Sequence, residues 1–183
     1  MGRRQRVLLD VDGVLADFVT SAAKVVEAVT GAPLPADALE EWDIFRSYDE
    51  ETRKKIYSAC KVEGWCLGLE PYAGAVDFVR HLDEIADVYF VTSPMDGPHW
   101  AFEREQWLKK HFGTHHHKVV STNAKYLCVG DVFVDDQFSH VEKWAKSHRH
   151  GVGVLWTQPY NLKDEWDYRA TTYNHIIEYV CKG

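Results

Sequence analysis

The sequence predicts an α/β fold in which a parallel sheet is covered by helices on both faces. From residue 71 onward, short apolar runs typical of strands alternate with amphipathic segments of helical period. These runs are apolar throughout, which is typical of strands buried on both faces. A helical block at 17–71 follows the first strand directly and is too long for an ordinary loop. We therefore expect a small helical cap inserted into a core formed by 1–16 and 72–183.

The first elements follow from these patterns in order. The first strand is expected over 7–9 and is apolar throughout. Within the block, one helix is expected over 20–31, with Thr20 or Ser21 as its N-cap. A second capped helix is expected over 49–60.

Strand and helix patterns then alternate to the end of the chain. Helices are expected over 71–84, 98–112, 139–150 and 171–181, and strands over 87–94, 118–125 (with a turn), 131–136 and 151–156. In a parallel sheet of this kind, ligands bind beyond the carboxyl ends of the strands. The residues that follow each strand are therefore the candidates for function.

Composition excludes several classes of protein. The chain has 183 residues, 45% of them hydrophobic, so we expect one domain, or a core with a modest insertion. Its net charge of −7 argues against a duplex nucleic acid as partner. It has no apolar run of transmembrane length and no signal-peptide pattern, and its four cysteines form no CxxC pair. We expect a soluble, cytoplasmic protein with reduced thiols.

The first strand leads into two carboxylates and a glycine. In the run RVLLDVDGVLADF, Asp10 and Asp12 are two apart and would project from the strand end in the same direction. Gly13 allows a turn where a side chain would obstruct a ligand. Paired carboxylates at a buried strand end raise each other's pKa, and a bound cation would relieve this. The plainer interpretation is a turn, since Asp and Gly both favour turns.

Polar residues also follow three further strands. They are Thr92 and Ser93, then Lys125, then Asp135 and Asp136. Alone, the hydroxyls would more often cap a helix, and the lysine would more often be solvated surface. Together with the first pair, however, they gather four carboxylates and one lysine at one edge of the sheet. All-oxygen ligands favour Mg²⁺ over zinc.

This ordered set resembles the four motifs of the haloacid dehalogenase (HAD) superfamily of phosphotransferases, over nearly the whole chain. More narrowly, DVDGVLADF, TSP and LEPxxGAV are similar to the 5′(3′)-deoxyribonucleotidase family. The resemblance implies a HAD-like, Rossmannoid core. It also implies a Mg²⁺-dependent phosphomonoesterase that dephosphorylates deoxyribonucleoside monophosphates through an aspartyl-phosphate.

The resemblance also implies roles for individual residues. Asp10 would be the nucleophile, and Asp12 the general acid and then the general base. Thr92 and Lys125 would hold the phosphoryl oxygens, with Ser93 adjacent. The ligands of Mg²⁺ would be Asp10, Asp136 and the backbone carbonyl of Asp12, with Asp135 supporting them from outside the coordination sphere.

Aromatic residues are the candidates for base recognition. Phe18 matches a family position, and Trp42, Phe45 and Trp65 are further candidates, although each is as readily part of the cap's own core. Trp42, Phe45 and Tyr48 are spaced three apart, so a helical turn would align them in one row.

Two motifs depart from the animal enzymes. The chain reads STNAK where those enzymes read closer to TRDKT, and QPYN at 158–161 is similar to bacterial and phage members but has no assigned role. His115–His117 is interpreted as a solvated loop and not as a zinc site.

Other functions compete with this one. The alternatives are a phosphatase of another small phosphomonoester such as a sugar phosphate, a phospho-acceptor signalling module, and a catalytically silent nucleotide-binding protein. A small-molecule nucleotide is the expected partner. A homodimer is left open as the assembly, as are the preferred base and the position of the phosphate.

Overall fold

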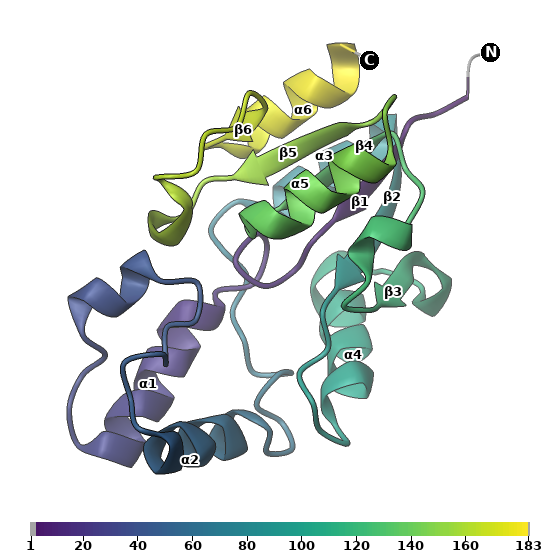
Figure 1. Ribbon diagram of the computed structural model, residues 1–183. Helices are drawn as coiled ribbons and strands as arrows, with labels where there is room; N and C mark the ends of the chain where they lie inside the picture. The colour runs from purple at the N-terminus through teal and green to yellow at the C-terminus, as the bar shows by residue number, and fades with distance from the viewer. Residues whose placement is uncertain (1–2, 183) are drawn as a thin grey trace.

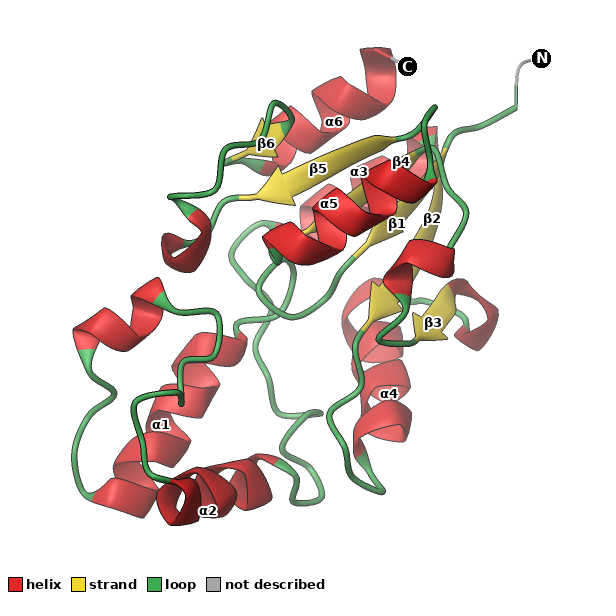
Figure 2. Cartoon of the chain, in the orientation of Figure 1, coloured by secondary structure: helices red, strands yellow, loops and turns green. Residues whose placement is uncertain are grey.

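The computed structural model describes residues 3–182 and shows an α/β fold with a parallel sheet (Figures 1 and 2). Residues 1–2 and 183, the ends of the expected core segments, lie outside the described residues. The sheet has the strand order β3-β2-β1-β4-β5-β6, and each neighbouring pair is parallel. The predicted fold class is confirmed.

The strands match the apolar runs of the sequence. They are β1 (Arg6–Leu9), β2 (Asp87–Thr92), β3 (Val119–Ser121), β4 (Val132–Asp135), β5 (Val152–Trp156) and β6 (Arg169–Ala170). The two-residue strand β6 was not predicted, because two residues are too few to show a period. β1 lies at the centre, with Leu9 level with Phe90 of β2 and Val134 of β4. The residues after these three strands therefore emerge side by side.

Helices cover both faces of the sheet. They are α3 (Ala75–Ile85), α4 (Trp100–Phe112), α5 (Phe138–Ser147) and α6 (Tyr173–Lys182). Along β1, Val7 and Leu9 pack with α3, α4 and α6, whereas Leu8 packs with α5 on the opposite face. Figure 1 shows α5 in front of the sheet and α3 behind it. Burial on both faces explains why β1, β2 and β4 carry runs of consecutive apolar residues instead of an alternating pattern.

Two further helices lie apart from the sheet. They are α1 (Phe18–Thr30) and α2 (Glu50–Cys60), and a short 3-10 turn, η1 (Ala36–Glu40), lies between them. Residues 18–60, here called the α1–α2 unit, contain no strand and lie beyond the carboxyl edge of the sheet (Figure 2). The unit has its own small core, which includes Val26, Phe45 and Ile56.

Some helix ends differ from the expected ones. α1 begins at Phe18, and its N-cap is neither Thr20 nor Ser21 but Asp17, whose carboxylate accepts a hydrogen bond from Thr20 N at 3.0 Å. The Asp17 carboxylate directly precedes the helix and can accept from its free N–H groups, whereas the hydroxyls of Thr20 and Ser21 already lie inside the helix. α4 begins at Trp100, two residues after its expected start.

The expected row of Trp42, Phe45 and Tyr48 is wrong. Residues 41–48 form turns and bends instead of a helix. The Asp43 carboxylate accepts a hydrogen bond from Phe45 N at 3.2 Å, which favours a turn over a helix. Phe45 is consequently buried against the ring of Tyr57, while Trp42 is 58% exposed.

None of the helices within residues 3–182 is both long and apolar enough to cross a membrane.

Trp107 on α4 offers a test of this packing. Its side chain is fully buried, and its indole N–H donates to the carbonyl of Leu69 at 2.7 Å. Trp107→Ala should lower the free energy of unfolding by about 3–5 kcal/mol, because it opens a cavity and leaves the buried carbonyl of Leu69 without its hydrogen-bond donor. Urea denaturation measures this. Phe102→Ala on the same helix is the control, since Phe102 is 67% exposed and its loss should change stability little. Equal stability of the two variants would contradict this account.

Candidate active site

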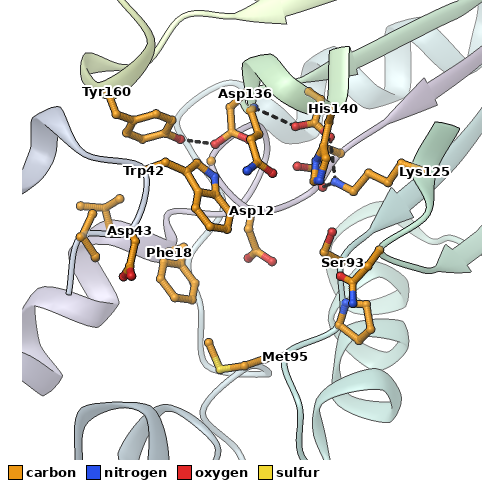
Figure 3. A pocket seen from close by; sticks show the side chains of 18 of the residues that line it. Asp12, Phe18, Trp42, Asp43, Ser93, Met95, Lys125, Asp136, His140 and Tyr160 are labelled. Atoms are coloured by element: carbon orange, nitrogen blue, oxygen red, sulfur yellow. Dashed lines mark hydrogen bonds and ion pairs between the residues drawn. The ribbon is translucent and has the colours of Figure 1, made fainter. Parts of the chain in front are cut away.

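A pocket lies between the carboxyl edge of the sheet and the α1–α2 unit. Its volume is about 300 Å³. Figure 3 shows Phe18 and Trp42 on one side of the pocket, and Ser93 and Lys125 on the other. Ser93 and Lys125 therefore reach the pocket from the loops that follow the strands, and Phe18 and Trp42 reach it from the α1–α2 unit.

Three buried carboxylates meet at the sheet edge. Asp10 follows β1, Asp135 ends β4 and Asp136 comes next, and each offers an oxygen within 4.8 Å of the others. Lys125, at the start of the 3-10 turn η3 (Lys125–Leu127), is also buried. Its Nζ lies 2.7 Å from Asp10 Oδ1 and 2.8 Å from Asp135 Oδ2. The structure thus brings four predicted site residues together around one charge centre.

The acid cluster carries more negative charge than the lysine neutralises. Burial, followed by the charge of Asp135, raises the pKa of Asp10 to about 7 despite the lowering effect of Lys125. Burial, followed by the charges of Asp10 and Asp135, raises the pKa of Asp136 well above its ordinary value. Burial alone would also raise the pKa of Asp135, but Lys125 and His140 hold it below the ordinary value.

This arrangement fits a divalent cation. In residues 3–182, no lysine, arginine or histidine nitrogen lies within 4.0 Å of the Asp136 carboxylate. The donors are all carboxylate oxygens, which suit a hard cation such as Mg²⁺. An added positive charge would offset both the burial and the repulsion that raise the pKa of Asp10 and Asp136.

Gly13 allows the loop after β1 to approach Asp136. Its φ of +76° lies in the left-handed region, and a Cβ there would stand 1.9 Å from Asp136 Oδ2. Any larger side chain would therefore push into the acid cluster.

Asp12 lies apart from the three clustered carboxylates. It lines the pocket, and its Oδ1 is 2.6 Å from a guanidinium nitrogen of Arg104. Arg104 is 1% exposed, and its guanidinium lies over the rings of Trp100 and Trp107. The pairing fixes the direction in which the Asp12 carboxylate points.

Sequence reasoning missed Arg104. An arginine in an amphipathic helix is ordinarily solvated, so its residue type did not indicate a buried position. The signal available was its spacing from Trp100 and Trp107, four before and three after, which places all three on one helix face.

The hydroxyls at the end of β2 are unpaired among the described residues. The Oγ atoms of Thr92 and Ser93 are both buried, and neither has a hydrogen-bond partner within the described residues. Ser93 lines the pocket. Such groups are costly to bury unless they are paired, so they mark this strand end as a place for an oxygen-rich ligand.

The predicted aromatic residues are divided by the structure. Phe18, Trp42 and Phe45 line the pocket, whereas Trp65 lies behind it. The ring of Trp65 contacts Phe18 edge-on at 5.4 Å and stacks on Trp100 at 5.8 Å. Trp65 therefore supports the aromatic wall instead of forming its surface.

Two pocket residues that contact the acid cluster had no predicted role. His140 on α5 places Nδ1 3.2 Å from Asp135 Oδ2. Tyr160, in the 3-10 turn η4 (Pro159–Asn161), donates its hydroxyl to the Asp136 carboxylate, as the dashed line in Figure 3 shows. Neither contact has a local sequence signal, because each joins residues from different elements.

Comparisons with known proteins show the family of the chain and agree with the fold. The model of the family described as "5′ nucleotidase, deoxy (pyrimidine), cytosolic type C protein" matches residues 4–182. The human cytosolic-type 5′(3′)-deoxyribonucleotidase is 31% identical over 147 residues, covering 75% of this chain and 73% of that protein. The mouse mitochondrial 5′(3′)-deoxyribonucleotidase is 32% identical over 169 residues, covering 87% and 76%.

A solved structure shares the fold at lower identity. A haloacid dehalogenase-like hydrolase from Burkholderia xenovorans superposes with a TM-score of 0.67 at 15% identity, covering 98% of each chain. The resemblance to HAD phosphatases of the deoxyribonucleotidase type is thereby confirmed. On the match that spans 4–182, the chain belongs to the 5′ nucleotidase, deoxy (pyrimidine), cytosolic type C family.

Proposed function

We propose that this protein is a Mg²⁺-dependent phosphatase of deoxyribonucleoside monophosphates that acts through an aspartyl-phosphate on Asp10. The observation that carries the proposal is the buried cluster of Asp10, Asp135 and Asp136 with Lys125 at the pocket floor. The names of the human and mouse relatives, both 5′(3′)-deoxyribonucleotidases, support the substrate class.

The carboxylate of Asp10 is oriented for attack on phosphorus. Its Oδ1 accepts hydrogen bonds from Val11 N at 2.7 Å and from Lys125 Nζ at 2.7 Å. In the first step an Asp10 oxygen bonds to phosphorus and the nucleoside oxygen leaves. Lys125, with the hydroxyls of Thr92 and Ser93, would bind the phosphoryl oxygens as negative charge develops on them.

Asp12 would serve both halves of the reaction. It gives a proton to the departing nucleoside oxygen, and then removes a proton from the water that hydrolyses the aspartyl-phosphate. The ion pair with Arg104 holds the carboxylate in place between the two steps.

Asp10, Asp136 and the backbone carbonyl of Asp12 would hold Mg²⁺, and Asp135 would support them from behind through Lys125. When bound, the cation supplies positive charge that offsets the charge of the phosphoryl group.

We further propose that residues 17–71 are a cap on a core formed by 1–16 and 72–183. The separate hydrophobic core of the α1–α2 unit supports this division. The cap would supply the base-binding wall, in which Phe18 and the exposed indole of Trp42 face the pocket. Stacking on an aromatic ring tolerates different bases because every base has a π-face.

The direct test is release of inorganic phosphate from deoxyribonucleotides, ribonucleotides, 3′-nucleotides and sugar phosphates, with Mg²⁺ and with EDTA. We expect metal-dependent release that favours deoxyribonucleoside monophosphates, because the site combines an oxygen-rich cation site with an aromatic wall. Release from sugar phosphates alone would contradict the proposed substrate class, and release in EDTA would contradict the proposed metal dependence.

Asp10→Asn tests the proposed nucleophile. The variant should release no phosphate while its circular dichroism spectrum stays unchanged. Full turnover in this variant would show that Asp10 is not the nucleophile.

Trp42→Ala tests the aromatic wall. Losing one stacked base contact of about 1–3 kcal/mol should lower kcat/KM for deoxyribonucleotides by about 5- to 150-fold. The value for p-nitrophenyl phosphate should change far less, since this substrate carries no base. An equal loss on both substrates would count against base stacking.

Gly13→Ala tests the close approach of the β1 loop to the acid cluster. The new Cβ would meet Asp136 Oδ2, so we expect metal-dependent turnover to fall by at least about tenfold, the range seen when support of a metal ligand is disturbed. Gly31→Ala is the matched control. Gly31 has a similar φ of +74° but has nothing within 4 Å of a Cβ. The Gly31→Ala variant therefore introduces backbone strain without a steric clash. A similar loss of activity in both variants would refute the steric explanation.

A further inference from the structure

The QPYN segment at 158–161 lies against the active site, although its sequence indicated no role. Its three polar side chains each contact a loop that carries a candidate catalytic or metal-binding residue. Gln158 Nε2 donates to the carbonyl of Gly13 at 2.6 Å, and Asn161 Nδ2 donates to the carbonyl of Asp136 at 2.7 Å. The Tyr160 hydroxyl donates to the Asp136 carboxylate. The segment therefore joins the loop after β1 to the end of β4.

Asn161 fixes this segment to the scaffold. It is 1% exposed, and its amide group makes four hydrogen bonds. Besides Asp136 O, Nδ2 donates to Trp156 O at 2.8 Å, while Oδ1 accepts from Gln158 N at 3.1 Å and from Arg169 at 2.8 Å. These bonds use the full capacity of an amide side chain. The turn that carries Tyr160 is thus held rigidly.

Tyr160, Asp136 and Gly13 converge on one point. A Cβ on Gly13 would stand 3.0 Å from the Tyr160 hydroxyl, as well as 1.9 Å from Asp136 Oδ2. Within residues 3–182, the Tyr160 hydroxyl is the side-chain donor to the Asp136 carboxylate, which has no cationic partner. A carboxylate has two oxygens, so a donor that holds Oδ2 leaves Oδ1 free for another ligand.

We propose that Tyr160 is a positioning residue for Asp136, which it orients for a divalent cation, and that Gln158 and Asn161 hold Tyr160 in register with the β1 loop. This inference rests on the proposed function in one respect, namely that the acid cluster holds a cation. Carboxylates that bind metals are commonly oriented by a hydrogen bond of this kind, and removing such a bond weakens metal affinity by about 10–100-fold.

The alternative is that the Tyr160 hydroxyl competes with the cation for Asp136. The two roles have opposite consequences for Tyr160→Phe, which removes the hydroxyl and keeps the ring. A positioning residue makes the variant bind the cation more weakly, whereas a competing residue makes it bind more tightly.

The experiment measures Mn²⁺ binding to the substrate-free protein by electron paramagnetic resonance, in which free Mn²⁺ is observed directly. We expect the Kd of Tyr160→Phe to rise by about 10–100-fold over that of the unmodified protein. Tyr168→Phe is the control, because the Tyr168 side chain is 45% exposed and does not line the pocket, and its Kd should not change. Turnover of Tyr160→Phe should recover at saturating Mg²⁺, since the chemical groups remain in place.

Other outcomes would overturn the inference. An equal or lower Kd in Tyr160→Phe, or a kcat that stays low at saturating Mg²⁺, would show that Tyr160 does not act by orienting a metal ligand. These results differ from a failure of the proposed function. If the unmodified protein bound no Mn²⁺, the cation site itself would be wrong, and the inference would fall with it.

Discussion

The repulsion among Asp10, Asp135 and Asp136 is the constraint on which the rest of the site depends. Buried carboxylates are costly unless positive charge or hydrogen bonds offset them. Lys125 contacts Asp10 and Asp135, which leaves Asp136 with a tyrosine hydroxyl and no cationic side chain among the described residues. The protein thus holds a preformed, oxygen-lined place for positive charge at the edge of a rigid sheet.

The topology explains why this charge can be concentrated there. β1 lies at the centre of the sheet, and its parallel neighbours β2 and β4 end within two residues of the level of its last residue, Leu9. Their carboxyl ends therefore deliver the hydroxyls of Thr92 and Ser93 on one side, and the carboxylates of β4 on the other. The apolar faces of the strands are covered by α3, α4 and α6 on one side and by α5 on the other. This packing keeps the strand ends at fixed separations.

Several parts of the protein outside the acid cluster surround the site. Groups from outside the four predicted motifs contact its carboxylates: the buried Arg104 pairs with Asp12, and the partly buried Tyr160 donates to Asp136. The α1–α2 unit closes the other side of the pocket with Phe18 and Trp42. In our proposal the core supplies the catalytic groups and the α1–α2 unit supplies contacts to the base.

The sequence by itself determined the fold class, the order of the strands along the chain and the polar residues that follow them. These features are local. The period of the apolar residues, and the type of residue that follows each strand, can be recognised from a short stretch of sequence alone. Local hydrogen bonds, from Thr20 N to Asp17 and from Phe45 N to Asp43, account for the N-cap of α1 and the loss of the aromatic row. Tertiary structure decided the Arg104 pair with Asp12 and the Tyr160 contact with Asp136. The residues of the Arg104 and Tyr160 pairs are 92 and 24 positions apart. Contacts between segments so distant in sequence depend on how helices and loops pack against the sheet. Local residue preferences do not determine that packing.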